Sequence, residues 1–177
     1  LCLWFLISIW MWAGIHKLIS VEWFTFISYD LLSQTPVNPN GLHRGFALLI
    51  GLSELGLAIA AWSRPKQVMI GCIALHGGIV VFLLCIGWNN SVIPWNLCTA
   101  IVGAWLLRNA ETTGSDSKQS SLVFPTAPVL RVLVVAMLIV PAGMYLGMVR
   151  HCFAHSLYSG NLPIALASSS ESVEVLE

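Results

Sequence analysis

The stretch HRGFALLIGLSELGLAIAAW, residues 43–62, decides the architecture of this chain. It has about the 20 residues that a helix needs to cross a hydrocarbon core of about 30 Å. One carboxyl group, Glu54, lies near the middle of this otherwise apolar run. A charged group at the bilayer centre costs about 2.5–3.5 kcal/mol on insertion scales, so it normally faces the interior of a bundle and has a partner. The stretch therefore predicts a membrane-spanning helix with an interior polar site.

The composition of the whole chain is that of a membrane protein. Of its 177 residues, 57% are hydrophobic and 9% are charged, whereas a soluble domain has about 25% charged residues. Eight basic and eight acidic side chains cancel, so no basic field predicts binding to nucleic acid. The five cysteines include no C-x-x-C pair, and a disulfide framework is not expected.

Other apolar runs predict further transmembrane helices. They lie at about residues 1–19, 67–88 and 129–150, with a shorter run at 91–107. For the shorter run, a re-entrant element is the open alternative. Residues 21–33 mix aromatic and acidic side chains and predict an interfacial helix, while 110–128 and 151–177 predict a polar loop and a polar tail. We therefore expect an all-α, polytopic transmembrane helix bundle.

The loop charges predict the orientation of this bundle. Five basic residues fall on the side of the 62–67 turn and three on the other side, which places the N-terminus in the cytoplasm and the C-terminus outside. The sequence begins at Leu1 without an initiator methionine, so we expect further residues before it. The first run ends without a small-residue cleavage pattern, and we interpret it as a retained anchor rather than a signal peptide.

Two more polar side chains are expected near Glu54. His76 lies about halfway along the antiparallel run at 67–88, so its imidazole can meet the carboxyl group as an ionic or, as burial favours, a neutral pair. The alternative is that both groups bond to backbone carbonyls and hold the bundle together. Lys17, at the end of the first run, either extends to the interface or turns inward to neutralise Glu54 or an anionic ligand group.

The remaining candidates are weaker. Gly143 and Gly147 form a G-x-x-x-G motif for helix packing. His151, Cys152 and His155 have a spacing that can chelate a metal, but two histidines are not a site, and no metal is predicted. The candidates for ligand or lipid contacts, for which ordinary interfacial anchoring is the alternative, are His43, Arg44, Trp88, Trp95 and Asn96.

Two short motifs resemble the DoxX/MauE family of small redox-associated membrane proteins. They are WAGIHKL at residues 12–18 and LSELGL at residues 52–57, separated by an interfacial aromatic stretch. Similar proteins of unassigned function also have a helical histidine like His76 and a turn like that at 88–96. The resemblance covers about residues 4–107. It implies a four-helix core at 1–109 with one added C-terminal helix, in a bacterial cytoplasmic membrane, and an association with quinone-linked or thiol-linked redox chemistry.

The paired cysteines that a thiol relay needs are missing, which leaves quinone or lipid binding, or a subunit role. The leading hypothesis is an integral membrane accessory or structural subunit of a larger redox-linked complex that contacts quinone or lipid. Its expected partners are the bilayer and other membrane subunits, and a quinone is the one cofactor that the resemblance implies. The alternative is a quinone-dependent oxidoreductase in which Glu54 or His76 carries protons. A proton-coupled transporter is less favoured, because no inverted repeat is visible.

Overall fold

The computed structural model describes residues 1–87, 92–113 and 125–146, and in these ranges the chain forms helices and turns without any strand. This confirms the all-α prediction. Two of the elements are not α-helices: η1 is a π-helix and η2 is a 3₁₀-helix. In chain order the elements are α1 (Cys2–Ile19), η1 (Trp23–Ile27), α2 (Ser28–Ser33), α3 (Leu42–Ala60), α4 (Pro65–Ile86), α5 (Val92–Thr113), α6 (Pro128–Ile139) and η2 (Val140–Leu146).

Three of the described helices, α1, α3 and α4, are long and apolar enough to cross a membrane. They agree with the apolar runs predicted at 1–19, 43–62 and 67–88, and they support the interpretation of the chain as a membrane protein. The helix α5 is continuous over 22 residues and extends beyond the predicted run at 91–107 into a more polar end. Residues 110–113, predicted to begin the polar loop, are still part of α5, and residues 114–124 lie outside the described part of the chain.

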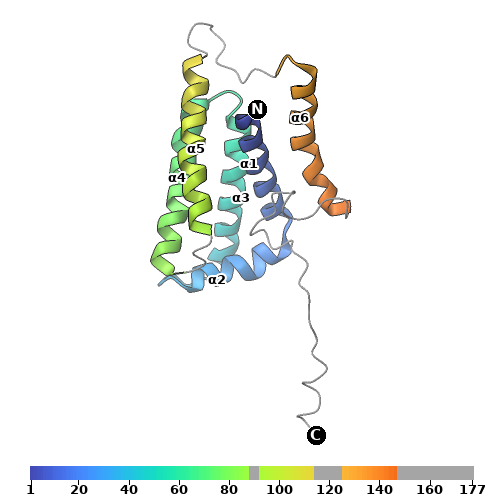
Figure 1. Ribbon diagram of the computed structural model, residues 1–177. Coiled ribbons are helices and arrows are strands. Elements are labelled where there is room, and N and C mark those ends of the chain that lie inside the picture. Colours follow the sequence, from blue (N-terminus) through green and yellow to red (C-terminus); the bar gives the residue numbers. More distant parts are fainter. Residues whose placement is uncertain (88–91, 114–124, 147–177) are drawn as a thin grey trace, which may run out of the picture.

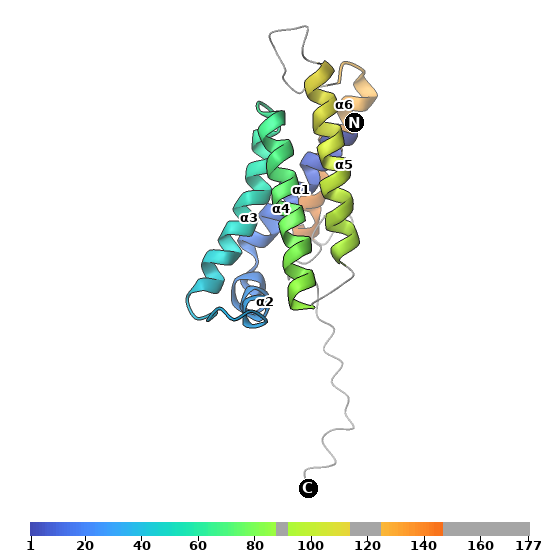
Figure 2. The same ribbon diagram turned by 90° about the vertical axis from the view of Figure 1, so that its left-hand side faces the viewer.

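The long helices run alternately in opposite directions (Figure 1). The closest pairs are α1 with α3 and α4 with α5, and α6 packs against α1 (Figures 1 and 2). The short helix α2 lies crosswise at one end of the long helices, as an interfacial segment would, and it contacts α3 (Figure 1). Half of the α1 span is buried, compared with 22% for α3 and 17% for α4. Helix α1 is therefore the central helix, and α3 and α4 present apolar faces outward.

The predicted transmembrane helix at 129–150 differs from the structure, in which α6 changes to a 3₁₀-helix after Ile139, and residues 147–150 lie outside the described part of the chain. The reason for the change is Pro141, which has no N–H to donate to the carbonyl of Met137 one helical turn earlier. The hydroxyl of Ser8 on α1 donates to that carbonyl instead, at 2.5 Å, and the indole N–H of Trp12 donates to the next carbonyl, that of Leu138, at 2.9 Å. The break in α6 thus supplies acceptors that hold this helix against α1.

The contact between α1 and α3 depends on a glycine. A Cβ atom placed on Gly14 would lie 2.8 Å from the carbonyl oxygen of Gly51 and 2.8 Å from the backbone nitrogen of Leu55. Both atoms belong to the α3 backbone, which cannot move aside as a flexible side chain would. Small residues allow such close approach of membrane helices, whose association cannot rely on a hydrophobic difference between helix and lipid.

Replacing Gly14 with alanine is expected to destabilise the protein by about 1–3 kcal/mol, because α1 and α3 must separate to admit the methyl group. Unfolding of the purified protein by denaturant in detergent measures this change. The matched control is Gly56→Ala, since a Cβ there meets nothing within 4 Å and alanine favours a helix. Equal stabilities for the two variants would contradict the close packing at Gly14.

Candidate functional site

A cavity of about 640 Å³ lies among α1, α3, α4 and α5, with η1 and α2 at one end and α6 and η2 along another side. It is partly enclosed, and its volume falls within the range of about 300–1,000 Å³ that is usual for small-molecule sites. Apolar and aromatic side chains make up most of its wall. The polar residues that line it are Lys17, Glu54, His76 and Asn96.

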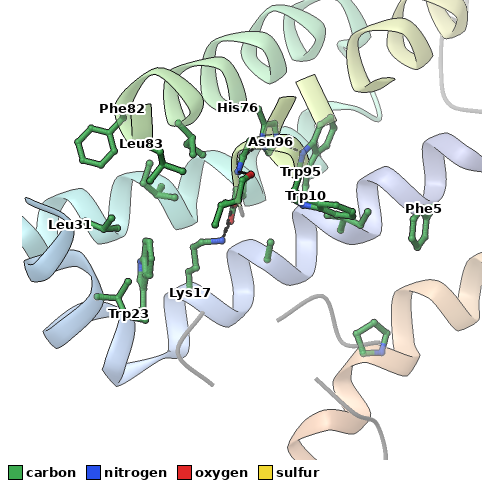
Figure 3. A pocket seen from close by; sticks show the side chains of 18 of the residues that line it. Phe5, Trp10, Lys17, Trp23, Leu31, His76, Phe82, Leu83, Trp95 and Asn96 are labelled. Carbon is green, nitrogen blue, oxygen red and sulfur yellow. Dashed lines mark hydrogen bonds and ion pairs between the residues drawn. The ribbon is translucent and has the colours of Figure 1, made fainter. Parts of the chain in front are cut away.

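Glu54 forms a buried salt bridge with Lys17 (Figure 3). The ammonium group of Lys17 donates to both carboxylate oxygens, at 3.0 and 2.8 Å, and the two side chains are only 8% and 7% exposed. The Lys17 nitrogen also lies 5.6 Å from the ring centroid of Trp23, which is within the range of a cation–π interaction. The interior carboxylate is therefore neutralised by a cation from the central helix.

His76 belongs to a second polar chain on the same cavity wall (Figure 3). Its Nε2 lies 2.9 Å from the indole nitrogen of Trp10, and its Nδ1 lies 2.8 Å from the side-chain oxygen of Asn96. An indole nitrogen can only donate, so Nε2 must accept and Nδ1 must carry the proton that is donated to Asn96. The Asn96 amide nitrogen donates in turn to the carbonyl of Val92 at 3.1 Å. The imidazole in this arrangement is uncharged.

The predicted direct pairing of Glu54 with His76 is wrong. Both groups are buried and both line the cavity, as expected, but Glu54 is bonded to Lys17 and both ring nitrogens of His76 are bonded to other groups. Lys17 does not extend to the interface. It turns inward because the central position of α1 places its long side chain beside α3, where a full positive charge offsets the carboxylate better than a neutral imidazole does.

The other predicted ligand or lipid contacts divide into two groups. Trp95 and Asn96 line the cavity, with Asn96 buried and Trp95 46% exposed. His43 and Arg44 lie away from it: the His43 ring donates to the carbonyl of Pro39 at 3.0 Å, and Arg44 is exposed. Trp88 lies outside the described residues.

The C-terminal candidates are largely outside the described part of the chain. Gly143 lies in η2, but its predicted packing partner Gly147 is not among the described residues, and neither are His151, Cys152 and His155. Within the described ranges, no group of three or more histidine, cysteine or acidic side chains could hold a metal ion.

Trp10 and Trp23 are site residues that the sequence reasoning missed. Trp10 is fully buried and donates to His76, while the indole of Trp23 packs near Lys17 and donates to the carbonyl of Ala47 at 3.2 Å. A signal for Trp10 was present, since Trp10, Ala13 and Lys17 are three and four residues apart and so share one face of α1. The usual role of tryptophan in transmembrane helices, anchoring at the membrane interface, concealed it.

Comparison of the chain with protein-family models, with curated proteins and with solved structures finds no match. The resemblance to the DoxX/MauE family therefore stays a prediction from short motifs.

The single variants Lys17→Met and Glu54→Gln are each expected to destabilise the protein by about 3–5 kcal/mol, because each leaves one buried group of the ion pair without its partner. The double variant K17M/E54Q is expected to lose less stability than the sum of the losses of the two single variants. Denaturant unfolding in detergent measures this double-mutant cycle.

The control for this cycle is Lys66→Met at the exposed start of α4, which is expected to change stability by less than about 0.5 kcal/mol. Strictly additive losses for Lys17 and Glu54 would show that the two side chains do not interact.

Proposed function

We propose that this chain is an integral membrane protein that binds a lipid-soluble ligand of the quinone class in its central cavity, as an accessory subunit of a redox-linked membrane complex. The observation that carries the proposal is the cavity itself. It is a mostly apolar space of about 640 Å³ with a small cluster of polar side chains on its wall. Sites of this kind bind molecules with an apolar body and a few polar atoms.

The wall of the cavity supports a largely apolar ligand. Four of its 22 lining residues are polar, and among the described residues no buried side-chain nitrogen or oxygen lacks a hydrogen-bond partner. These buried polar groups therefore do not need the ligand as a hydrogen-bond partner. Its binding free energy comes mainly from apolar surface removed from water or lipid contact, at about 25 cal/mol per Å² when the reference is water.

The exposed residues at the outer part of the cavity support entry of the ligand from the side of the bundle. Phe5 on α1 and Trp95 on α5 both line the cavity, and they are 43% and 46% exposed. On an apolar helix bundle these positions face the region that acyl chains would occupy. A long apolar tail can leave the cavity here while a polar head group lies near Lys17, which Figure 3 shows on the other side of Trp10 from Phe5.

The subunit role rests on the DoxX/MauE resemblance and on the outward apolar faces of α3 and α4. These faces suit lipid and equally suit the helices of another membrane subunit. The four-helix core with an added C-terminal helix, and the cytoplasmic N-terminus, belong to this same proposal.

The chain purified from its native membrane is expected to retain a lipid-soluble molecule that solvent extraction and mass spectrometry identify. Ala13→Phe, which adds a ring to the cavity wall beside the polar group, is expected to lose most of it. The control is Ala74→Phe on the exposed face of α4, which makes the same chemical change outside the cavity.

Equal retention by the two variants would place the ligand elsewhere and overturn the binding role. The same preparation tests the subunit role, because a monomer without any stoichiometric protein partner would contradict it.

The second candidate function is a quinone-dependent oxidoreductase, and the shared cavity wall of Glu54 and His76 favours it. In that case proton transfer would use groups that already contact the site, although the described hydrogen bonds do not join Glu54 to His76. Quinone reduction by the natively purified assembly is then expected to fall at least about a hundredfold in Glu54→Gln, the lower end of what is lost with a general acid or base. Unchanged turnover in a folded Glu54→Gln variant would remove this role.

A further inference from the structure

We infer that the cavity selects a ligand whose head group is uncharged and accepts a hydrogen bond from Lys17. This inference rests on the proposed ligand-binding function and specifies the chemistry that the site recognises. Its basis is the balance of charge on the cavity wall, together with the number of hydrogen-bond donors that the wall leaves available.

The lining residues that the structure describes have a formal net charge of zero. Lys17 and Glu54 are the one cation and the one anion among the lining residues that the structure describes, and they neutralise each other at 2.8 Å. His76 adds no charge, because its Nε2 accepts from the indole of Trp10.

A charged head group would disturb this balance. An anion placed next to Lys17 would also lie beside the Glu54 carboxylate, with no second cation on the described wall to offset it. A cation next to Glu54 would meet Lys17 in the same way. Interactions between charges are strong in an environment of low dielectric constant, so both arrangements are disfavoured relative to a neutral group.

The wall still offers a donor for a neutral group. A lysine ammonium has three N–H groups, and the hydrogen bonds of Lys17 within the described residues use two of them, both to Glu54. The third can donate to a carbonyl, ester or hydroxyl oxygen in the cavity. Such an oxygen gains a charge-assisted hydrogen bond without bringing a charge of its own. Quinones share this chemistry with neutral esters and ketones, whereas phospholipids and fatty acids bring a charged head group.

The experiment compares two probes that differ in charge and by one methyl group: 9,10-dibromostearate and its methyl ester. Bromine atoms quench tryptophan fluorescence on contact, and Trp10 and Trp95 both line the cavity. Each probe is titrated in alkaline buffer, where the fatty acid is ionised, into the full chain in detergent micelles. Quenching at the site is the difference between the wild-type protein and the cavity-filled variant Ala13→Phe.

The wild-type protein is expected to bind the ester at least about tenfold more tightly than the ionised acid, which corresponds to about 1.4 kcal/mol. Glu54→Gln leaves the Lys17 charge without its partner, and this variant is expected to reverse the preference in favour of the acid. The double variant K17M/E54Q restores a neutral wall and is expected to prefer the ester again. Its preference is expected to be weaker than that of the wild-type protein, because the lysine donor is gone.

The outcomes separate the two proposals. If both probes quench the wild-type protein and Ala13→Phe equally, the cavity is not a binding site, and the proposed function fails. If quenching is specific to the cavity but the acid binds as tightly as the ester, the ligand site stands and the inference about its head group is overturned. The wild-type comparison decides this even if Glu54→Gln does not fold.

Discussion

The buried ion pair between Lys17 and Glu54 is the interaction on which the rest of the structure depends. Apolar helices in a bilayer have no hydrophobic reason to prefer one another over lipid, so small residues and polar bonds determine which faces meet. Lys17 lies on α1 and Glu54 on α3, and the same two helices approach each other closely at Gly14. The ion pair fixes how α1 is rotated against α3, and the glycine makes the approach possible.

A second polar chain attaches the other half of the bundle to the same central helix. Trp10 on α1 donates to His76 on α4, which donates to Asn96 on α5. Each of these groups is buried, so an unmade bond would leave a polar group in an apolar interior. The α4–α5 pair is therefore joined to α1 at one level of the cavity wall. The cavity extends from the crosswise segment of η1 and α2, past the two polar chains, to α6 and η2.

The positions of the helices could be predicted from the sequence better than the contacts between them. Apolar runs gave α1, α3 and α4, and the cost of a carboxylate in lipid placed Glu54 inside. The sequence offered both His76 and Lys17 as partners of Glu54 but could not decide between them. Depth along a helix does not specify its rotation, and Lys17 at a helix end has an easy route to the interface unless its helix is central. The break in α6 was predictable, since Pro141 cannot complete a helical hydrogen bond, but the apolar run concealed it.

The complete pairing of the polar groups has a consequence for how the proposed ligand is held. In the described part of the chain the buried side-chain nitrogen and oxygen atoms are satisfied without a ligand, so departure of the ligand leaves no buried polar group without a partner. A structural lipid that completes a fold typically satisfies groups that would otherwise be unpaired. The proposed ligand would contribute apolar contact and one additional acceptor for Lys17, so its affinity would depend on its ring and tail rather than on the integrity of the bundle. This arrangement suits a molecule that exchanges with the membrane more than one that is bound permanently.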